Sequence, residues 1–131
     1  MTNRKSGILL HVTSLPGNDG TGTLGKNAYK FVDFLEKSKQ KMWQILPLGQ
    51  VGFGDSPYQC YSAFAGNIQL IDLELLAEEG WLKKSEIKLP RFSKTKADFA
   101  KARKWKMPLL HKSYETFQAN LEPWLNEYFY F

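Results

Sequence analysis

The sequence is poor in cysteine and in long apolar runs, and each shortage excludes a class of protein. Cys60 is the single cysteine among 131 residues, so no disulfide can form within the chain, and a reducing cytoplasm is the expected compartment. The apolar run after Arg4 and Lys5 covers only residues 8–10, too short for the core of a signal peptide. No apolar stretch approaches the roughly 20 residues that span a bilayer, so we expect no membrane association.

Acidic residues are also scarce in one segment, and this concentrates the net charge of +5 there. Residues 83–106 hold ten of the eighteen basic residues and two of the thirteen acidic ones, so the remainder of the chain is net negative. A basic run of this kind is most often a solvated helix face, and a nucleic-acid-binding surface is the alternative. The nearby Phe92, Phe99 and Trp105 suit core packing as well as base stacking. We therefore expect no nucleic-acid partner.

The first third of the chain has the pattern of a strand, a helix and a second strand. Residues 7–12 form a nearly continuous apolar run, which predicts a strand buried on both faces. Apolar residues then recur at helical spacing between Ala28 and Leu35, and residues 42–46 predict a second strand that Pro47 ends. A βαβ unit places both strands parallel in one sheet. The following loops should therefore share the carboxyl edge, where ligands collect in such folds.

The remaining pattern is more helical and predicts a chain that belongs to a larger fold. Residues 70–73 predict another extended segment, a helical turn should end near Gly80, and residues 95–118 predict helix. Pro108 predicts a kink, or two helices that meet near Met107. We expect residues 1–80 to be an α/β part of that larger fold, and residues 81–131 a more helical part.

Two features at the C-terminal end bear on the helical part and on the larger fold. Pro123 suits the first turn of a final helix. The aromatic run at 128–131 and the need of two apolar strands for further neighbours both favour a fold that continues beyond this chain.

Residues 49–67 are the stretch best suited to binding. Glycine, hydroxyl, amide and aromatic residues are dense here, and the segment is longer than a usual strand–helix connection. Sugars need this combination, because their C–H faces pack on aromatic rings while their hydroxyl groups bond to polar side chains. A structural Ω-loop held by its own aromatic residues is the alternative.

Several motifs in register resemble the start of the amylomaltase, or 4-α-glucanotransferase, family. They are residues 6–17, 43–49, 54–59, 62–67 and 70–73. The likeness is dense from 6 to about 76 and looser through Trp105, Lys106, Pro108 and Phe117. The order and number of these motifs make the resemblance specific.

The resemblance implies the N-terminal portion of a (β/α)8 barrel with helical insertions, in which residues 1–80 form the first βαβ part of the barrel and residues 81–131 a helical insertion. Enzymes of the family transfer α-1,4-glucan segments between maltodextrins by a retaining mechanism with two carboxylates. In the family these groups lie on later strands, so we assign no catalytic residue within this chain and expect the chain alone to be inactive. The implied partner is a maltodextrin or starch-type glucan, and no metal or organic cofactor is implied.

The same resemblance nominates four substrate-binding residues. Tyr58 corresponds to a tyrosine that stacks on the donor sugar, Ser56 contacts the glucan, and Asp55 braces the loop. Phe53 stands where tyrosine is common, so it keeps a stacking face but lacks the hydroxyl. Further departures are Val12, where proline is common, and residues 50–51, where Pro-Thr is common. A non-catalytic glucan-binding module that uses Tyr58 is the alternative function.

Other residues with reactive side chains have simpler interpretations. Asp19 and Asp55 lie in loops expected at one edge, so a carboxylate pair within the chain is conceivable, although turn residues such as Asp19 usually bend the backbone. We expect His11 to be a hydrogen-bonded structural residue, Trp43 to be part of the core, and Cys60 to be an inert thiol.

Overall fold

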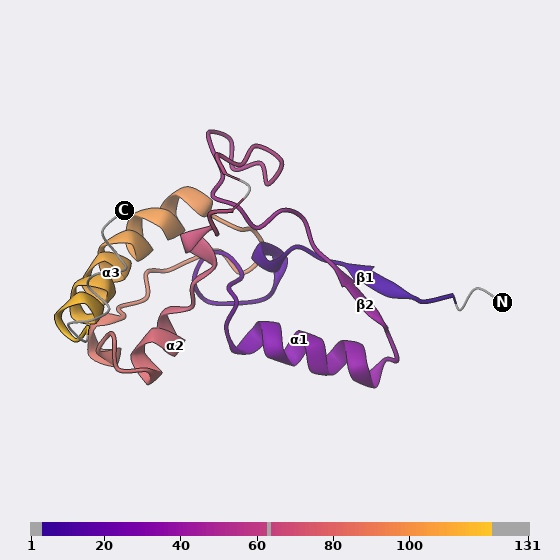
Figure 1. The fold of residues 1–131 in the computed structure, drawn as a ribbon, viewed down its shortest axis with the longest axis horizontal. Coiled ribbons are helices and arrows are strands. Elements are labelled where there is room, and N and C mark those ends of the chain that lie inside the picture. The colour runs from indigo at the N-terminus through magenta and orange to yellow at the C-terminus, as the bar shows by residue number, and fades with distance from the viewer. Residues whose placement is uncertain (1–3, 63, 122–131) are drawn as a thin grey trace.

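The computed structural model describes residues 4–62 and 64–121. Figure 1 shows the β1–β2 ribbon and α1 at one end of the molecule and α2 and α3 at the other. The 49–67 loop projects from the middle of this arrangement. The expected final helix from Pro123 and the aromatic run at 128–131 lie outside the described residues.

The predicted βαβ unit is confirmed. β1 (Gly7–Leu9) and β2 (Met42–Gln44) pair in parallel, and Ile8 lies opposite Trp43. α1 (Lys26–Lys37) connects them and buries Ala28 and Leu35, as its helical spacing predicted. Both strands are shorter than predicted. β1 ends at Leu9, ahead of a 3₁₀ helix, η1 (Val12–Ser14), and β2 ends at Gln44 rather than at Leu46.

The expectation that the strands are buried on both faces is wrong for the described structure. Ile8 and Trp43 lie on one face and are half-buried, while Leu9 and Met42 on the other face are 58% and 52% exposed. α1 covers one face of the ribbon: the Phe31 ring meets the Trp43 ring edge-on at 4.9 Å. Trp43 also donates from Nε1 to the Leu10 carbonyl at 2.7 Å, so its predicted place in the core is confirmed.

A compact apolar core forms where the ends of these elements meet. Its buried members are Val12, Leu15, Ala28 and Leu70, with Leu10, Phe31, Trp43 and Leu48 packed around them. The core therefore lies directly beneath the loops that follow the two strands, and it fixes their starting points.

The predicted extended segment at 70–73 is extended only at Ile71 and Asp72, and these two residues link two short helices. A 3₁₀ helix, η2 (Ile68–Leu70), is followed by α2 (Leu73–Glu78). The Asn67 side chain accepts from the Gln69 amide, and the Asp72 side chain accepts from the Leu75 amide at 3.1 Å. These caps satisfy the first amide groups of each short helix and outweigh the β-propensity of an apolar run. α2 ends before Gly80, as predicted.

α3 (Phe99–Ala119) is one continuous helix, so the alternative of two helices meeting near Met107 is wrong. Pro108 is accommodated because both halves pack on the same side: Ala102 and Lys106 are buried before it and Ser113 after it. A short 3₁₀ helix, η3 (Lys84–Glu86), precedes α3. None of the helices within residues 4–62 and 64–121 has the length and apolar character needed to cross a membrane.

Candidate functional site

The loops after β1 and β2 meet at the carboxyl edge of the ribbon, as predicted, and enclose a cavity of about 280 Å³. His11, Thr13 and Ser14 line it from the first loop, and Val51, Asp55 and Pro57 from the second. α3 closes the other side with Phe99 and Arg103. Three segments far apart in the sequence therefore contribute polar groups to one hollow.

The 49–67 loop is folded as an irregular hairpin. Isolated antiparallel bridges join Gly49 to Gly66 and Val51 to Cys60. Within it, the Gly52 amide donates to the Gln59 carbonyl at 3.0 Å. The tip turns through Gly54 and Asp55, whose φ angles are 90° and 53°. Glycine adopts this left-handed region freely, and aspartate is among the few other residues that tolerate it.

The four predicted substrate-binding residues lie together on this hairpin. Tyr58 is 73% exposed and Phe53 is 99% exposed, so the rings are accessible, while Ser56 and Asp55 are half-buried. Whether they contact a glucan stays a prediction. Tyr61 and Phe64 are equally exposed at 79% and 100%, and the sequence analysis did not single them out. The density of aromatic residues in the loop was the signal that could have identified them.

Asp55 forms an ion pair with α3. Its Oδ1 lies 2.5 Å from a terminal guanidinium nitrogen of Arg103, and both side chains are partly exposed. The sequence analysis expected the basic segment to be a solvated helix face, whereas Arg103 contacts a strand-end loop. Arg103 was missed because its partner lies 48 residues earlier in the chain.

α3 also contacts the 13–25 loop. The Asp98 amide donates to the Gly20 carbonyl at 2.9 Å, and the fully buried Lys106 ammonium lies 3.8 Å from an Asp19 carboxylate oxygen. Burial raises the pKa of the Asp19 carboxyl, against the opposing effect of Lys106. Asp19 and Asp55 therefore face two different cations on α3, which does not favour a catalytic pair made by these two groups.

His11 lines the cavity, but the hydrogen bond expected for it is not formed at Nδ1. This atom is buried with no partner among the described residues. Burial lowers the pKa of His11, which favours the neutral imidazole.

Cys60 is an unpaired cysteine whose Sγ donates to the Pro57 carbonyl at 2.9 Å, so its thiol forms a hydrogen bond within the hairpin. Across residues 4–62 and 64–121, no three His, Cys, Asp or Glu side chains gather into a potential metal site.

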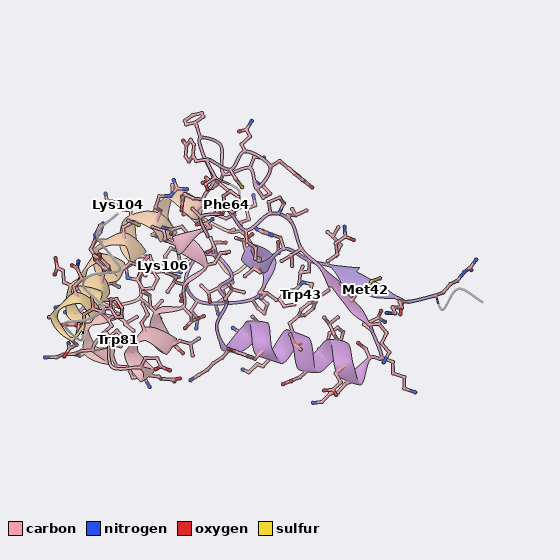
Figure 2. All side chains as sticks on the ribbon, in the orientation of Figure 1. Met42, Trp43, Phe64, Trp81, Lys104 and Lys106 are labelled. Carbon is pink, nitrogen blue, oxygen red and sulfur yellow. The ribbon has the colours of Figure 1, made fainter. Side chains whose placement is uncertain are left out.

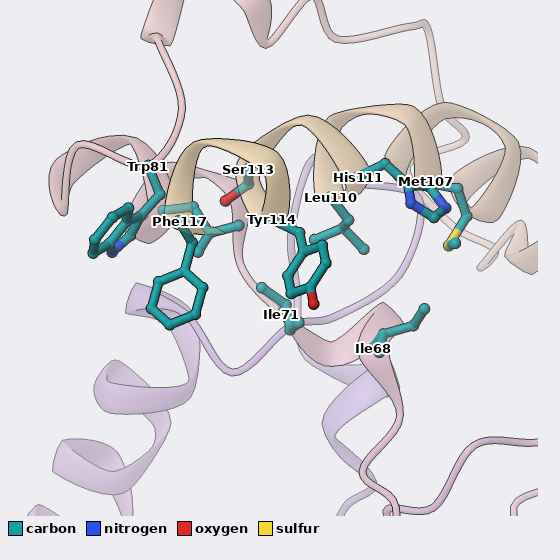
Figure 3. A pocket seen from close by; sticks show the side chains of 10 residues that line it. Ile68, Ile71, Trp81, Met107, Leu110, His111, Ser113, Tyr114 and Phe117 are labelled. Atoms are coloured by element: carbon teal, nitrogen blue, oxygen red, sulfur yellow. The ribbon is translucent and has the colours of Figure 1, made fainter. Parts of the chain in front are cut away.

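A second, larger hollow of about 450 Å³ lies between α3 and the η2–α2 segment. Figure 3 shows Leu110, Tyr114 and Phe117 of α3 turned toward Ile68 and Ile71, with Trp81 beside Phe117. This lining is largely apolar and lies away from the strand-end loops, so it has the character of a packing surface. The cavity at the carboxyl edge is the better candidate.

The comparisons with known proteins agree on one family. A family model described as 4-alpha-glucanotransferase matches residues 10–130. The 4-alpha-glucanotransferase of Streptococcus pneumoniae serotype 4 is 49% identical over 119 residues, which are 89% of this chain and 24% of that protein. The Synechocystis protein of the same name is 49% identical over 120 residues, 91% of this chain and 24% of its own length.

A solved structure gives the same result. The amylomaltase from Streptococcus agalactiae in complex with acarbose superposes with a TM-score of 0.84 at 47% identity, over 90% of this chain and 24% of that one. The chain thus spans about a quarter of the length of the relatives it matches. The match covers both strand-end loops and α3, and the chain belongs to the 4-α-glucanotransferase family.

Proposed function

We propose that this chain is the first part of a (β/α)8-barrel 4-α-glucanotransferase that transfers α-1,4-glucan segments between maltodextrins with retention of configuration. Residues 1–80 begin the barrel, and residues 81–131 form a helical insertion that packs on its strand-end loops. The exposed Leu9 and Met42 support this architecture, because neighbouring strands and helices of a closed barrel would cover them. The unpaired Cys60 supports a cytoplasmic location.

The exposed ring of Tyr58, which follows Pro57 of the carboxyl-edge cavity lining, is the observation that carries the proposal. In barrel enzymes this edge holds the substrate, and an accessible aromatic face suits the apolar side of a glucose unit. Ser56 and Phe53 lie on the same hairpin and would contact neighbouring parts of the glucan. The similar amylomaltase from Streptococcus agalactiae was solved in complex with acarbose, which supports a sugar-type ligand for this family member.

The catalytic carboxylates are proposed to lie outside these 131 residues. A retaining glycosidase needs two carboxyl groups about 5–5.5 Å apart. Within the described residues, Asp55 is held by Arg103 and Asp19 faces Lys106, so neither has the free, paired arrangement that this chemistry requires.

Substitution of Tyr58 in the full-length protein tests the proposal. Tyr58→Ala removes a stacking face and a hydroxyl, and we expect transfer on maltotriose to fall by a factor of roughly 30 to 1,000, equivalent to about 2–4 kcal/mol. Phe53→Ala should reduce transfer much less. Tyr29→Ala is the matched control, because Tyr29 is 66% exposed on α1 and undergoes the same truncation away from the loop. Near-normal transfer by a folded Tyr58→Ala protein would contradict the assignment of this residue.

A further inference from the structure

The Asp55–Arg103 ion pair connects the tip of the 49–67 hairpin to a fixed helix. Hydrogen bonds within the hairpin, such as that from the Gly52 amide to the Gln59 carbonyl, tie its two arms to each other. The contact with Arg103 is different, because it reaches a separate element 48 residues away. It holds the residue directly before Ser56 and three before Tyr58.

The α3 end of this contact is rigidly placed. Ala102 and Lys106, on either side of Arg103, are 2% and 0% exposed. Lys106 donates from Nζ to the Gln69 and Ile71 carbonyls at 3.0 and 3.1 Å, and Asp98 at the start of the helix is bonded to Gly20. Figure 2 shows Lys106 on the inner side of α3, directed into the body of the molecule. Arg103 therefore projects from a helix turn that cannot shift without disrupting buried contacts.

The hairpin end lacks comparable packing. Phe53 is 99% exposed and Tyr58 is 73% exposed, so little apolar burial fixes the tip. Asp55 itself has a φ of 53°, a left-handed conformation that a residue with a side chain adopts at a cost in free energy. The ion pair therefore stabilises the part of the hairpin that has the least packing and an unfavourable backbone conformation.

We propose that Arg103 is a positioning residue: through its ion pair with Asp55 it holds the 49–67 hairpin in the conformation in which Tyr58 and Ser56 meet the glucan. This inference rests on the proposed function. Both side chains are partly exposed, at 40% for Arg103 and 29% for Asp55, so the pair contributes little to global stability. Its effect is geometric, and a displacement of about 1 Å at a substrate-positioning group lowers turnover as much as 100-fold.

The test uses four variants of the full-length protein. Arg103→Gln and Asp55→Asn each remove one charge of the pair, and asparagine keeps the tolerance for the left-handed backbone at position 55. The double variant carries both changes, and Arg103→Lys keeps the charge without the forked guanidinium donors. Lys104→Gln is the matched control, because Lys104 is an exposed cation on the next residue of the same helix (Figure 2).

We expect each single variant to lower kcat/KM for maltotriose transfer about 10- to 100-fold, with a melting temperature within about 2 °C of the wild type. The double variant should be no worse than the worse single variant, because both changes remove the same contact. Arg103→Lys should retain an intermediate rate, and Lys104→Gln should retain the wild-type rate. Hydrogen exchange in peptides covering residues 50–62 should become faster in the single variants.

Three results would overturn the proposal: a kcat/KM within twofold of the wild type in either single variant, a double variant whose loss is the product of the two single losses, or unchanged exchange in residues 50–62. If Arg103→Gln fails to fold, Asp55→Asn carries the same comparison. If the wild-type protein itself shows no transfer, the proposed function fails instead. The exchange rates of the hairpin then still decide whether Arg103 holds it.

Discussion

Lys106 is the buried charge on which the packing of α3 depends, and its replacement by methionine is the most informative perturbation of the fold. Its side chain is 0% exposed. Its ammonium group donates hydrogen bonds to the Gln69 and Ile71 carbonyls and lies 3.8 Å from the Asp19 carboxylate. Lys106→Met keeps most of the apolar stem, but it leaves two carbonyls without a charged donor and one half-buried carboxylate without its counter-charge. We expect a loss of about 3–5 kcal/mol in the local stability of α3.

The loss should depend on pH in a direction that Asp19 determines. Burial already raises the pKa of the Asp19 carboxyl, with Asp72 and Glu74 adding to the effect, and Lys106 is the group that lowers it. Removing Lys106 raises this pKa further. A carboxyl with a raised pKa stabilises the folded state fully below its unfolded pKa, and this contribution is lost as the pH rises through the folded pKa. The cost of Lys106→Met should therefore be larger at pH 8 than at pH 5.

Hydrogen exchange of α3 peptides in the full-length protein measures this cost locally, after correction for intrinsic exchange rates at each pH. Lys104→Met is the control, since Lys104 is exposed on the same helix and its loss should change local stability by less than about 0.5 kcal/mol. Adding Asp19→Asn to Lys106→Met should restore part of the stability lost at pH 8. A cost below about 1 kcal/mol, or an equal cost at both pH values, would refute the reasoning.

Three further outcomes follow from the structure and the sequence. Asp72→Ala removes the N-cap of α2 and the acceptor of the Thr23 hydroxyl, so amides of α2 should lose about 1–2 kcal/mol of protection in hydrogen exchange, and unchanged protection would exclude a capping role. The isolated 131-residue chain should form neither glucose nor longer maltodextrins from maltotriose, and formation of both in proportion to its concentration would place the catalytic groups within it. The basic segment should bind no nucleic acid, so a mobility-shift titration at low salt that shows sub-micromolar, salt-sensitive binding would contradict that expectation.

Local sequence patterns were sufficient for the βαβ unit. The spacing of Ala28, Phe31 and Leu35 specifies the packed face of α1, so neighbouring residues alone contain this information. Two details were not predicted: Val32 of the same pattern is 49% exposed, and β2 ends at Gln44, before it reaches Pro47. The family was also evident from contiguous motifs, because the residues of the glycine-rich 49–67 loop lie close together in the sequence. The same local reasoning was only partly right at 70–73: Ile71 and Asp72 are extended, but the Asp72 carboxylate caps a helix that begins at Leu73 and that the apolar run did not indicate.

Only the tertiary structure decided which cationic side chains of the basic segment point inward and which groups they bind. Lys106 and Arg103 are one helical turn apart and look alike in a sequence of lysines and arginines. One is buried against the carbonyls of η2 and beside Asp19, while the other reaches Asp55 at the hairpin tip. Gln69 lies 37 residues before Lys106 and Asp55 lies 48 residues before Arg103, so the pairing depends on where α3 packs. The charge pattern determined that α3 is basic, and the packing of its Ala102 and Lys106 side determined which cation meets each loop, because an ion pair forms only where two elements are brought within contact distance.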